Sequence, residues 1–449
     1  MNQDWTPPAP IPPKSGPGDW LRSLKTFRSQ IEGLPERIFT QSAWRPPIPG
    51  TPFFVMAPEL IEQVLLTQAD SFTHGDLLPR MMRPAWGKGM FLAEGEAWRT
   101  QRQAAAPAFR AREIETLVHR FVAATEKMLE RWLKQDGAEV ELHGEMQRLT
   151  FEIIVDVLLS GGEGFDSDMM RRDVAGLFAE VNHIRASYIL MPDSWHASRP
   201  PIRSEYRVRI MSHIRSLIRT RRSSPARGDL IDLLLKATDP QTGEALSDEL
   251  LADNLLGFVV AGFMTTAVAL TWTLWLTTSH APTRGRLGRE LAEVLGDQPL
   301  TSQSLGGLTF AGQVIKESLR LYPPAHTIAR VSRDEAELGG HRIRPGQRII
   351  VPIYAVHRHA AQWTSPHRFD PARFSPDQQV PQRFAFMPFG GGPRICIGLA
   401  FAMTEITCVL ATLLRAIDIR IANGTKIWPQ AGVVLYPRNG IRVRISAKI

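Results

Sequence analysis

The sequence predicts a mostly α-helical protein with small β-sheets. Apolar residues recur with the 3.6-residue period of a helix over residues 111–132, 147–159 and 169–181. Residues 254–282 contain no Lys, Arg, Asp or Glu, which predicts a long apolar helix. The segments that read as strands are short, and the tail that ends at Ile449 alternates enough for small sheets.

Composition restricts the class of protein. The chain has 449 residues, of which 43% are hydrophobic, enough for a large core, and no linker or repeat divides it. Two cysteines, Cys396 and Cys408, exclude a disulfide framework and indicate a reducing, cytoplasmic location. The net charge of +8 is not gathered into a polybasic block, and no nucleic-acid motif is visible. We therefore expect an acidic protein partner and no nucleic acid.

The N-terminal quarter begins with a proline-rich arm over residues 1–50. It has neither an apolar segment nor a basic start, so we expect no signal peptide and no membrane anchor. A short strand over 52–55 and an amphipathic helix over 58–68 follow. Residues 75–93 contain two prolines and three glycines and are predicted to be a long functional loop.

The middle of the chain is predicted to be helical. Trp98 and Arg102 share one face of a helix over 94–109, since they are four residues apart. A strongly basic helix is predicted over 206–221, after a proline-containing break at 185–201. Residues 254–282 are long enough to cross a membrane. Their position in mid-chain and their interior threonines, which include Thr265, Thr266, Thr271 and Thr273, favour a buried helix instead.

The C-terminal third alternates between helix and strand. A helix over 310–322 ends at Pro323-Pro324 and places Glu317 and Arg320 three residues apart, so that they can pair. Short strands are predicted over 325–333 and 341–351, with a turn at Gly339-Gly340. A helix follows over 397–416.

The stretch from Phe389 to Gly398 carries the strongest chemical signal. Three consecutive glycines permit positive φ and close approach to a flat partner, and a cysteine at the start of a helix is favoured as thiolate. Such a loop suits a haem iron with a cysteine ligand. The alternatives are an inert core cysteine, as expected for Cys408, or a phosphate-binding loop. The glycines fit neither G-x-x-x-x-G-K-[ST] nor G-x-G-x-x-G.

The same stretch matches F-x-x-G-x-R-x-C-x-G and thereby resembles the haem-binding loop of the cytochrome P450 family, in its soluble bacterial-type form. The matching residues are Phe389, Gly392, Arg394, Cys396 and Gly398. Residues 261–266 are similar to the family's A-G-x-[DE]-T-[TS], with Met264 where the pattern has an acid. W-x-x-x-R and E-x-x-R also occur in the family's order, at Trp98 and Glu317. The resemblance covers most of the chain and is weakest before residue 70.

The resemblance implies a single haem domain over 51–449, and a role for each matching residue. Cys396 would be the axial ligand of the iron of haem b, in a loop shaped by Phe389 and Gly398. The other implied groups are the propionate contacts Trp98, Arg102, Arg330 and Arg394; the distal residues Gly262, Thr265 and Thr266, with Thr265 in a local helix distortion; and the structural cluster Glu317, Arg320 and Arg373.

The implied function is insertion of one atom of O₂ into an apolar organic substrate, with a pocket formed by residues 75–93 and 183–201 and by residues near Phe258, Phe263 and Ile328. The chain has no cysteines for an iron–sulfur cluster, so electrons would come from an acidic ferredoxin or flavodoxin with its NAD(P)H reductase. The partner would dock on a basic face that includes Arg99, Arg102, Arg110, Arg112 and Arg383. A monomer is expected.

Three other functions stay open at this point. One is a haem-thiolate peroxygenase or isomerase that needs no reductase. The second is a haem-binding sensor without catalytic activity. The third is a membrane protein that spans at residues 255–278.

Overall fold

The computed structural model describes residues 5–12, 14, 16, 29–47, 50–75, 77–134, 137–159, 167–182, 204–227, 229–239, 241–379 and 381–448. The chain divides into two compact units, each built from stretches that are distant in sequence. Unit 1 contains Met1–Thr73, Val118–Leu149 and Thr265–Ile449, and unit 2 contains His74–Leu117 and Thr150–Met264. The predicted break at 185–201 lies outside the described residues. The fold class predicted from the sequence, mostly α with small sheets, is confirmed.

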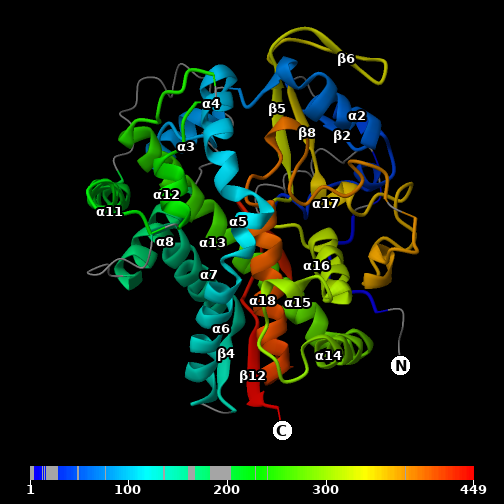
Figure 1. The fold of residues 1–449 in the computed structure, drawn as a ribbon. Helices are drawn as coiled ribbons and strands as arrows, with labels where there is room; N and C mark the ends of the chain where they lie inside the picture. The colour runs from blue at the N-terminus through cyan, green and yellow to red at the C-terminus, as the bar shows by residue number, and fades with distance from the viewer. Residues whose placement is uncertain are drawn as a thin grey trace. The chain divides into compact units, whose positions relative to one another are not determined.

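In unit 1, α18 (Leu399–Ala416) packs against α6 (Val118–Leu133) and α16 (Thr309–Leu321) (Figure 1). The rings of Phe121 on α6 and Phe401 on α18 meet edge to face, with centroids 5.1 Å apart. Every residue of α16 from Val314 to Leu321 except Lys316 is buried, so this helix is part of the core. The other helices of the unit are η2 (Glu36–Phe39), α2 (Pro58–Glu62), η3 (Gln63–Thr67), η4 (Ala69–Ser71), α14 (Ala281–Leu295), α15 (Ser302–Leu305), α17 (Ile353–Val356), η6 (Pro371–Phe374) and η7 (Gly392–Arg394).

Among the described residues, four small sheets complete unit 1. The largest has the order β1-β2-β8-β5-β3; β2 and β8 run parallel, whereas the other neighbours are antiparallel. The predicted turn at Gly339-Gly340 joins β6 to β7, and both glycines have positive φ, +56° and +78°. The strands are β1 (Ala43–Trp44), β2 (Phe53–Val55), β3 (Phe72–Thr73), β4 (Glu139–Glu141), β5 (Ile328–Ser332), β6 (Ala336–Leu338), β7 (His341–Ile343), β8 (Arg348–Val351), β9 (Ile417–Ile421), β10 (Pro429–Ala431), β11 (Leu435–Pro437) and β12 (Arg442–Ala447).

Unit 2 is helical. Its α11 (Glu205–Arg222) packs closely on α8 (Ser167–Asn182), because Gly176 leaves room for the Tyr206 ring: a Cβ at Gly176 would lie 2.6 Å from it. Arg221 is buried at the end of α11 and is paired with Asp229 and Asp232. The unit also contains α3 (Leu77–Trp86), α4 (Gly95–Ala105), η5 (Ala106–Phe109), α5 (Ala111–Glu115) and α12 (Leu230–Leu235).

Two helices continue from one unit into the other: α7 (Leu142–Leu159) and α13 (Asp248–Ser279). Both α13 and α18 are long and apolar enough to cross a membrane, but most of the apolar window of α13 is buried within the protein. Burial of this kind is typical of a core helix, and length with composition is weak evidence for a span.

The structure corrects two of the predicted elements. Residues 75–93 are not a long loop, because α3 occupies ten of them. Pro79 is tolerated in its first turn, where the backbone N–H groups have no partner within the helix, and Gly87 ends the helix with φ of +65°. The predicted helix over 111–132 is interrupted between Glu115 and Val118, which separates α5 from α6.

Candidate active site

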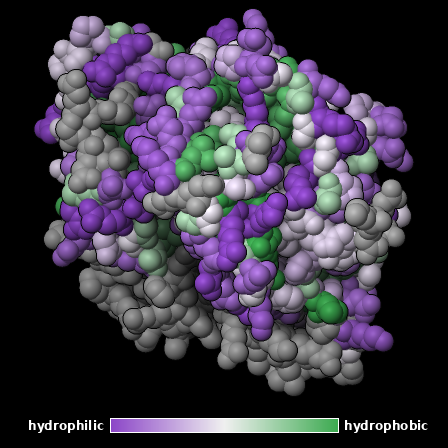
Figure 2. Space-filling model, turned by 90° about the horizontal axis from the view of Figure 1, so that it is seen from below, coloured by the Kyte–Doolittle hydropathy of each residue, from purple (hydrophilic) through white to green (hydrophobic). Residues whose placement is uncertain are grey.

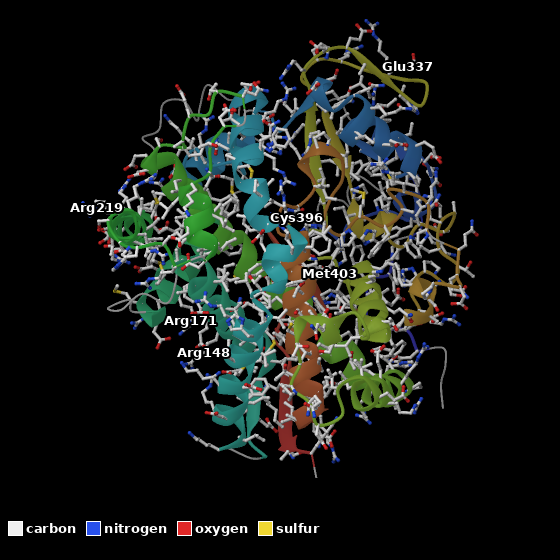
Figure 3. All side chains as sticks on the ribbon, viewed as in Figure 1. Arg148, Arg171, Arg219, Glu337, Cys396 and Met403 are labelled. Atoms are coloured by element: carbon white, nitrogen blue, oxygen red, sulfur yellow. The ribbon has the colours of Figure 1, made fainter. Side chains whose placement is uncertain are left out.

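Cys396 lies on a loop that leads into α18. The backbone N–H of Cys396 donates to the carbonyl of Phe389 across the loop, at 2.9 Å. Gly390 and Gly392 have φ of +74° and +67°, values that L-residues rarely adopt, whereas Gly391 is extended. Figure 3 shows Cys396 at the head of α18 and Met403 farther along the helix. The glycines therefore set the path of the chain that presents the sulfur.

The two cysteines have opposite environments. Cys396 is exposed, whereas Cys408 is fully buried two turns into α18. Burial, together with the nearby Glu405, raises the pKa of Cys408 to about 12, so it stays a thiol at neutral pH. A thiolate ligand has to be accessible and deprotonated, and of the two only Cys396 is exposed.

The glycine run is packed closely against unit 1 itself. A Cβ on Gly392 would lie 1.7 Å from the carbonyl oxygen of Leu65 in η3, and one on Gly391 would lie 2.4 Å from the Phe384 ring. By contrast, a Cβ on Gly390 would meet only Ile328, at 3.7 Å. Two of the three glycines are thus explained by contacts within the chain, whereas the sequence had suggested a flat partner for all three.

Glu317 is the centre of a buried ion-pair cluster. Its carboxylate accepts two hydrogen bonds of 2.7 Å from Arg320, and both side chains are fully buried. It also accepts a 2.8 Å bond from the backbone of Asp370 and lies 3.5 Å from Nε of Arg373. Arg320 further donates to the carbonyls of His357, Pro366 and Arg368. The cluster therefore fastens α16 to the chain that precedes the cysteine loop.

The middle of α13 is buried on all sides except one stripe. The exposed residue Ala261 and the partly exposed residues are spaced as one face of a helix: Gly257, Phe258, Ala261, Gly262 and Thr265. The helix is α throughout, so the distortion expected at Thr265 is absent. Hydroxyls of Thr271, Thr273 and Thr277 donate to carbonyls four residues earlier without breaking the helix.

Thr266 and Phe263 point away from that stripe. Thr266 is buried, and its hydroxyl lies beside the carboxyl group of Glu405 on α18. Phe263 is buried against Phe151 of α7, with ring centroids 5.5 Å apart. Phe263 is therefore a core residue, whereas the sequence had suggested an open pocket near it.

Glu405 is a buried acid that sequence reasoning missed. It is 1% exposed, and its Oε1 has no hydrogen-bond partner among the described residues. Burial raises its pKa well above the ordinary value, which favours the protonated form of the carboxyl group. An acidic residue in the middle of a strongly apolar helix was the available signal in the sequence.

The remaining predicted residues occupy several elements. Trp98 and Arg102 lie one turn apart on α4 and are half-buried. Arg330 is on β5, on the same face as Ile328, which lies against Gly390. Arg394 is half-buried in η7. A Cβ on Gly262 would lie 3.0 Å from Cδ1 of Ile154 of α7, so the end of that side chain would have to shift by a few tenths of an ångström.

A haem group fits the residues of unit 1. The loop offers one exposed soft sulfur, and a Cβ at Gly398 would lie 3.9 Å from it, an ordinary van der Waals contact. Half-buried Arg330 and Arg394 are cations suited to carboxylate groups. An exposed cysteine on a glycine-shaped loop, with cations that suit carboxylates in the same unit, is the arrangement that a protein with a cysteine-bound haem iron requires.

Comparisons with known proteins agree with this class. Residues 43–444 match the family described as cytochrome P450. The chain is 32% identical to cytokinin hydroxylase of Arabidopsis thaliana, over 80% of this chain and 71% of that protein. It is 30% identical to cyclooctatin synthase of Streptomyces melanosporofaciens, over 83% and 82%. A crystal structure of the cytochrome P450DA heme domain superposes with a TM-score of 0.84 over 98% of both chains, at 24% identity.

The chain therefore belongs to the cytochrome P450 family, the monooxygenases that carry haem b. The fold class and the family expected from the sequence are both confirmed. The resemblance had been identified from the loop around Cys396, and the match extends over nearly the whole chain.

Proposed function

We propose that the protein is a soluble haem-thiolate monooxygenase that inserts one oxygen atom into an apolar organic molecule and receives its electrons from a separate acidic protein. The observation that carries the proposal is the exposed Cys396 on its glycine-shaped loop, at the head of α18. Haem, when bound, supplies the activation of O₂, and the chain supplies binding, orientation and control of protons.

Cys396 would hold the iron through Sγ, and Arg330 and Arg394 would hold the propionates. The substrate class rests on the open stripe of α13, in which Gly257, Phe258 and Ala261 present apolar surface. Phe258 is held in place by Phe109, with ring centroids 5.0 Å apart. An apolar wall of this kind binds by excluding water and sets few hydrogen-bond requirements on the substrate.

Proton supply is assigned to Thr265, Thr266 and Glu405, because Met264 cannot deliver a proton. Burial raises the pKa of Glu405, which favours its protonated form, and the Thr266 hydroxyl lies beside its carboxyl group. Thr265 is next to Thr266 and lies on the open stripe of α13. Protons would therefore reach the stripe through the adjacent hydroxyls of Thr266 and Thr265, with Glu405 as the buried acid next to Thr266.

The electron donor is proposed to be acidic on account of the +8 net charge. Several of the arginines predicted for its docking site already have an acidic neighbour. Arg99 is 3.7 Å from Glu96, and Arg383 is 3.7 Å from Glu62. We therefore expect long-range steering by net charge more than tight pairing at these positions.

Solubility is proposed from the burial of α13 and from the surface. Figure 2 shows polar residues over much of the face in view, with apolar residues in separate patches among the coloured atoms. The protein is expected to stay in the supernatant when membranes are sedimented without detergent. Quantitative recovery in the membrane fraction would contradict this part of the proposal.

The reduced-CO difference spectrum tests the proposal directly. Wild type should give the Soret band of a thiolate-bound haem, Cys396→Ala should lose it, and Cys408→Ser should keep it. A thiolate band in Cys396→Ala would refute the assignment of the ligand. Turnover with a ferredoxin and its reductase, compared with turnover on peroxide alone, separates a monooxygenase from a peroxygenase.

A further inference from the structure

His357 is a buried histidine between the Glu317–Arg320 cluster and the cysteine loop. It follows the last residue of α17 and is fully buried, and it belongs to none of the sequence motifs described above. Arg320 donates from Nη1 to the carbonyl of His357 at 2.9 Å. In the opposite direction, Nδ1–H of the His357 imidazole donates to the carbonyl of Arg320 at 3.3 Å. The side chain of each residue is therefore hydrogen-bonded to the backbone of the other.

The other ring nitrogen of His357 reaches the cysteine loop. Nε2 accepts a 2.9 Å hydrogen bond from the buried backbone N–H of Met387. The carbonyl of Met387 in turn accepts from Gly390 N–H at 3.0 Å, and the carbonyl of Phe389 accepts from Cys396 N–H at 2.9 Å. The side chain of His357 thus connects helix α16 to the turn from which the cysteine segment starts.

The ring must be neutral for this arrangement, since an imidazolium has no acceptor at Nε2. Burial, with the positive charges of Arg320 and Arg358, lowers the pKa of His357 to about 3. An aromatic neighbour fixes the ring plane: Phe386 lies with its centroid 5.3 Å away at 32°. The tautomer is set by the two contacts, with the proton on Nδ1 and the lone pair on Nε2.

We propose that His357 is a positioning residue for the iron ligand: by holding the Met387 N–H it fixes the loop that presents Cys396, and thereby keeps the thiolate on the metal. This inference rests on the proposed haem-thiolate function. It adds a requirement, namely that loss of the Nε2 acceptor releases the loop although Cys396, the glycines and the Glu317–Arg320 pair all remain.

His357→Phe is the direct test. Phenylalanine preserves the aromatic contact with Phe386 and removes both ring hydrogen bonds, so Met387 N–H is left buried without an acceptor. In the haem-loaded enzyme, we expect the thiolate-type CO band to convert to the thiol-type band about tenfold faster than in wild type at one fixed temperature. The same conversion rate in His357→Phe and wild type would overturn the proposal.

His359→Phe is the matched control. His359 is also buried, but its Nε2–H donates to the carbonyl of Gln41, away from the cysteine loop. This variant should lower the urea midpoint of unfolding and leave the rate of band conversion at the wild-type value. Conversion as fast as that of His357→Phe would show a general loss of stability and would refute the positioning role.

A second pair of variants serves if His357→Phe does not accumulate. Glutamine carries an oxygen to the position of Nε2, whereas asparagine reaches only the position of Nδ1. His357→Gln should therefore keep the thiolate band and His357→Asn should lose it, and equal behaviour of the two would count against the proposal. Absence of the thiolate band in wild type would instead refute the proposed function, so the two failures are distinguishable.

Discussion

Replacement of Gly392 by alanine should disrupt the cysteine loop, and replacement of Gly390 is the matched comparison. Both glycines have positive φ, +67° and +74°, so alanine costs about 1–2 kcal/mol of backbone strain at either site. At Gly390 the new Cβ would meet Ile328 at an ordinary 3.7 Å. At Gly392 it would lie 1.7 Å from the backbone oxygen of Leu65, which no side-chain rotation can relieve.

To restore even a tight contact, the loop or η3 would have to move by about 1.3 Å. Overpacking of this kind typically costs about 1–3 kcal/mol more. We therefore expect Gly392→Ala to lose about 2–5 kcal/mol and Gly390→Ala about 1–2 kcal/mol, against a total stability of about 5–15 kcal/mol. Gly392→Ala should also bind haem poorly, because the same segment carries Cys396.

The assay combines urea unfolding of both variants with the reduced-CO spectrum after haem loading. The expected order of unfolding midpoints is wild type, then Gly390→Ala, then Gly392→Ala, with the thiolate band weakest in the last. Equal midpoints and equal bands in the two variants would refute the reasoning, because strain alone would then account for both.

Four further predictions concern chemistry and charge. Thr265→Ala should uncouple NAD(P)H use from product and release peroxide, whereas Met264→Glu should keep or raise coupling; full coupling in Thr265→Ala would exclude this relay. Glu405→Gln should flatten the pH dependence of the free energy of unfolding, because burial raises the pKa of Glu405 in the folded state. Wild type therefore loses stability as pH rises above about 4.5, by up to about 1.4 kcal/mol per pH unit until the folded-state pKa is reached. Urea midpoints at pH 5 and 8 that shift equally in both proteins would contradict it. Glu317→Gln should cost about 3–5 kcal/mol in the same urea assay, because two arginines lose their carboxylate. Electron transfer from an acidic ferredoxin should slow between about 0.1 M and 1 M salt, and a constant rate would argue against steering.

The sequence by itself determined the family and most of the helices, and it selected Cys396 as the proposed ligand. A cysteine after three glycines is a local pattern, and so are a 3.6-residue period and an uncharged stretch of helix length. Such patterns can be interpreted without knowledge of the fold, because they depend on backbone freedom and on the spacing of neighbours along one element. This is why Cys396 could be separated from Cys408, and why the bounds of α8, α11 and α16 were predicted to within two residues.

Only the tertiary structure decided what each polar group contacts. Residues 75–93 looked like a loop because two prolines and three glycines outweighed a weak helical pattern, yet α3 forms there. Phe263 looked like a pocket residue until α7 was seen to cover it. Glu405 meets Thr266 across 139 positions of sequence, and His357 reaches Met387 across thirty. Contacts of this kind depend on which faces the chain brings together, and burial then fixes their protonation, so no local pattern could have predicted them.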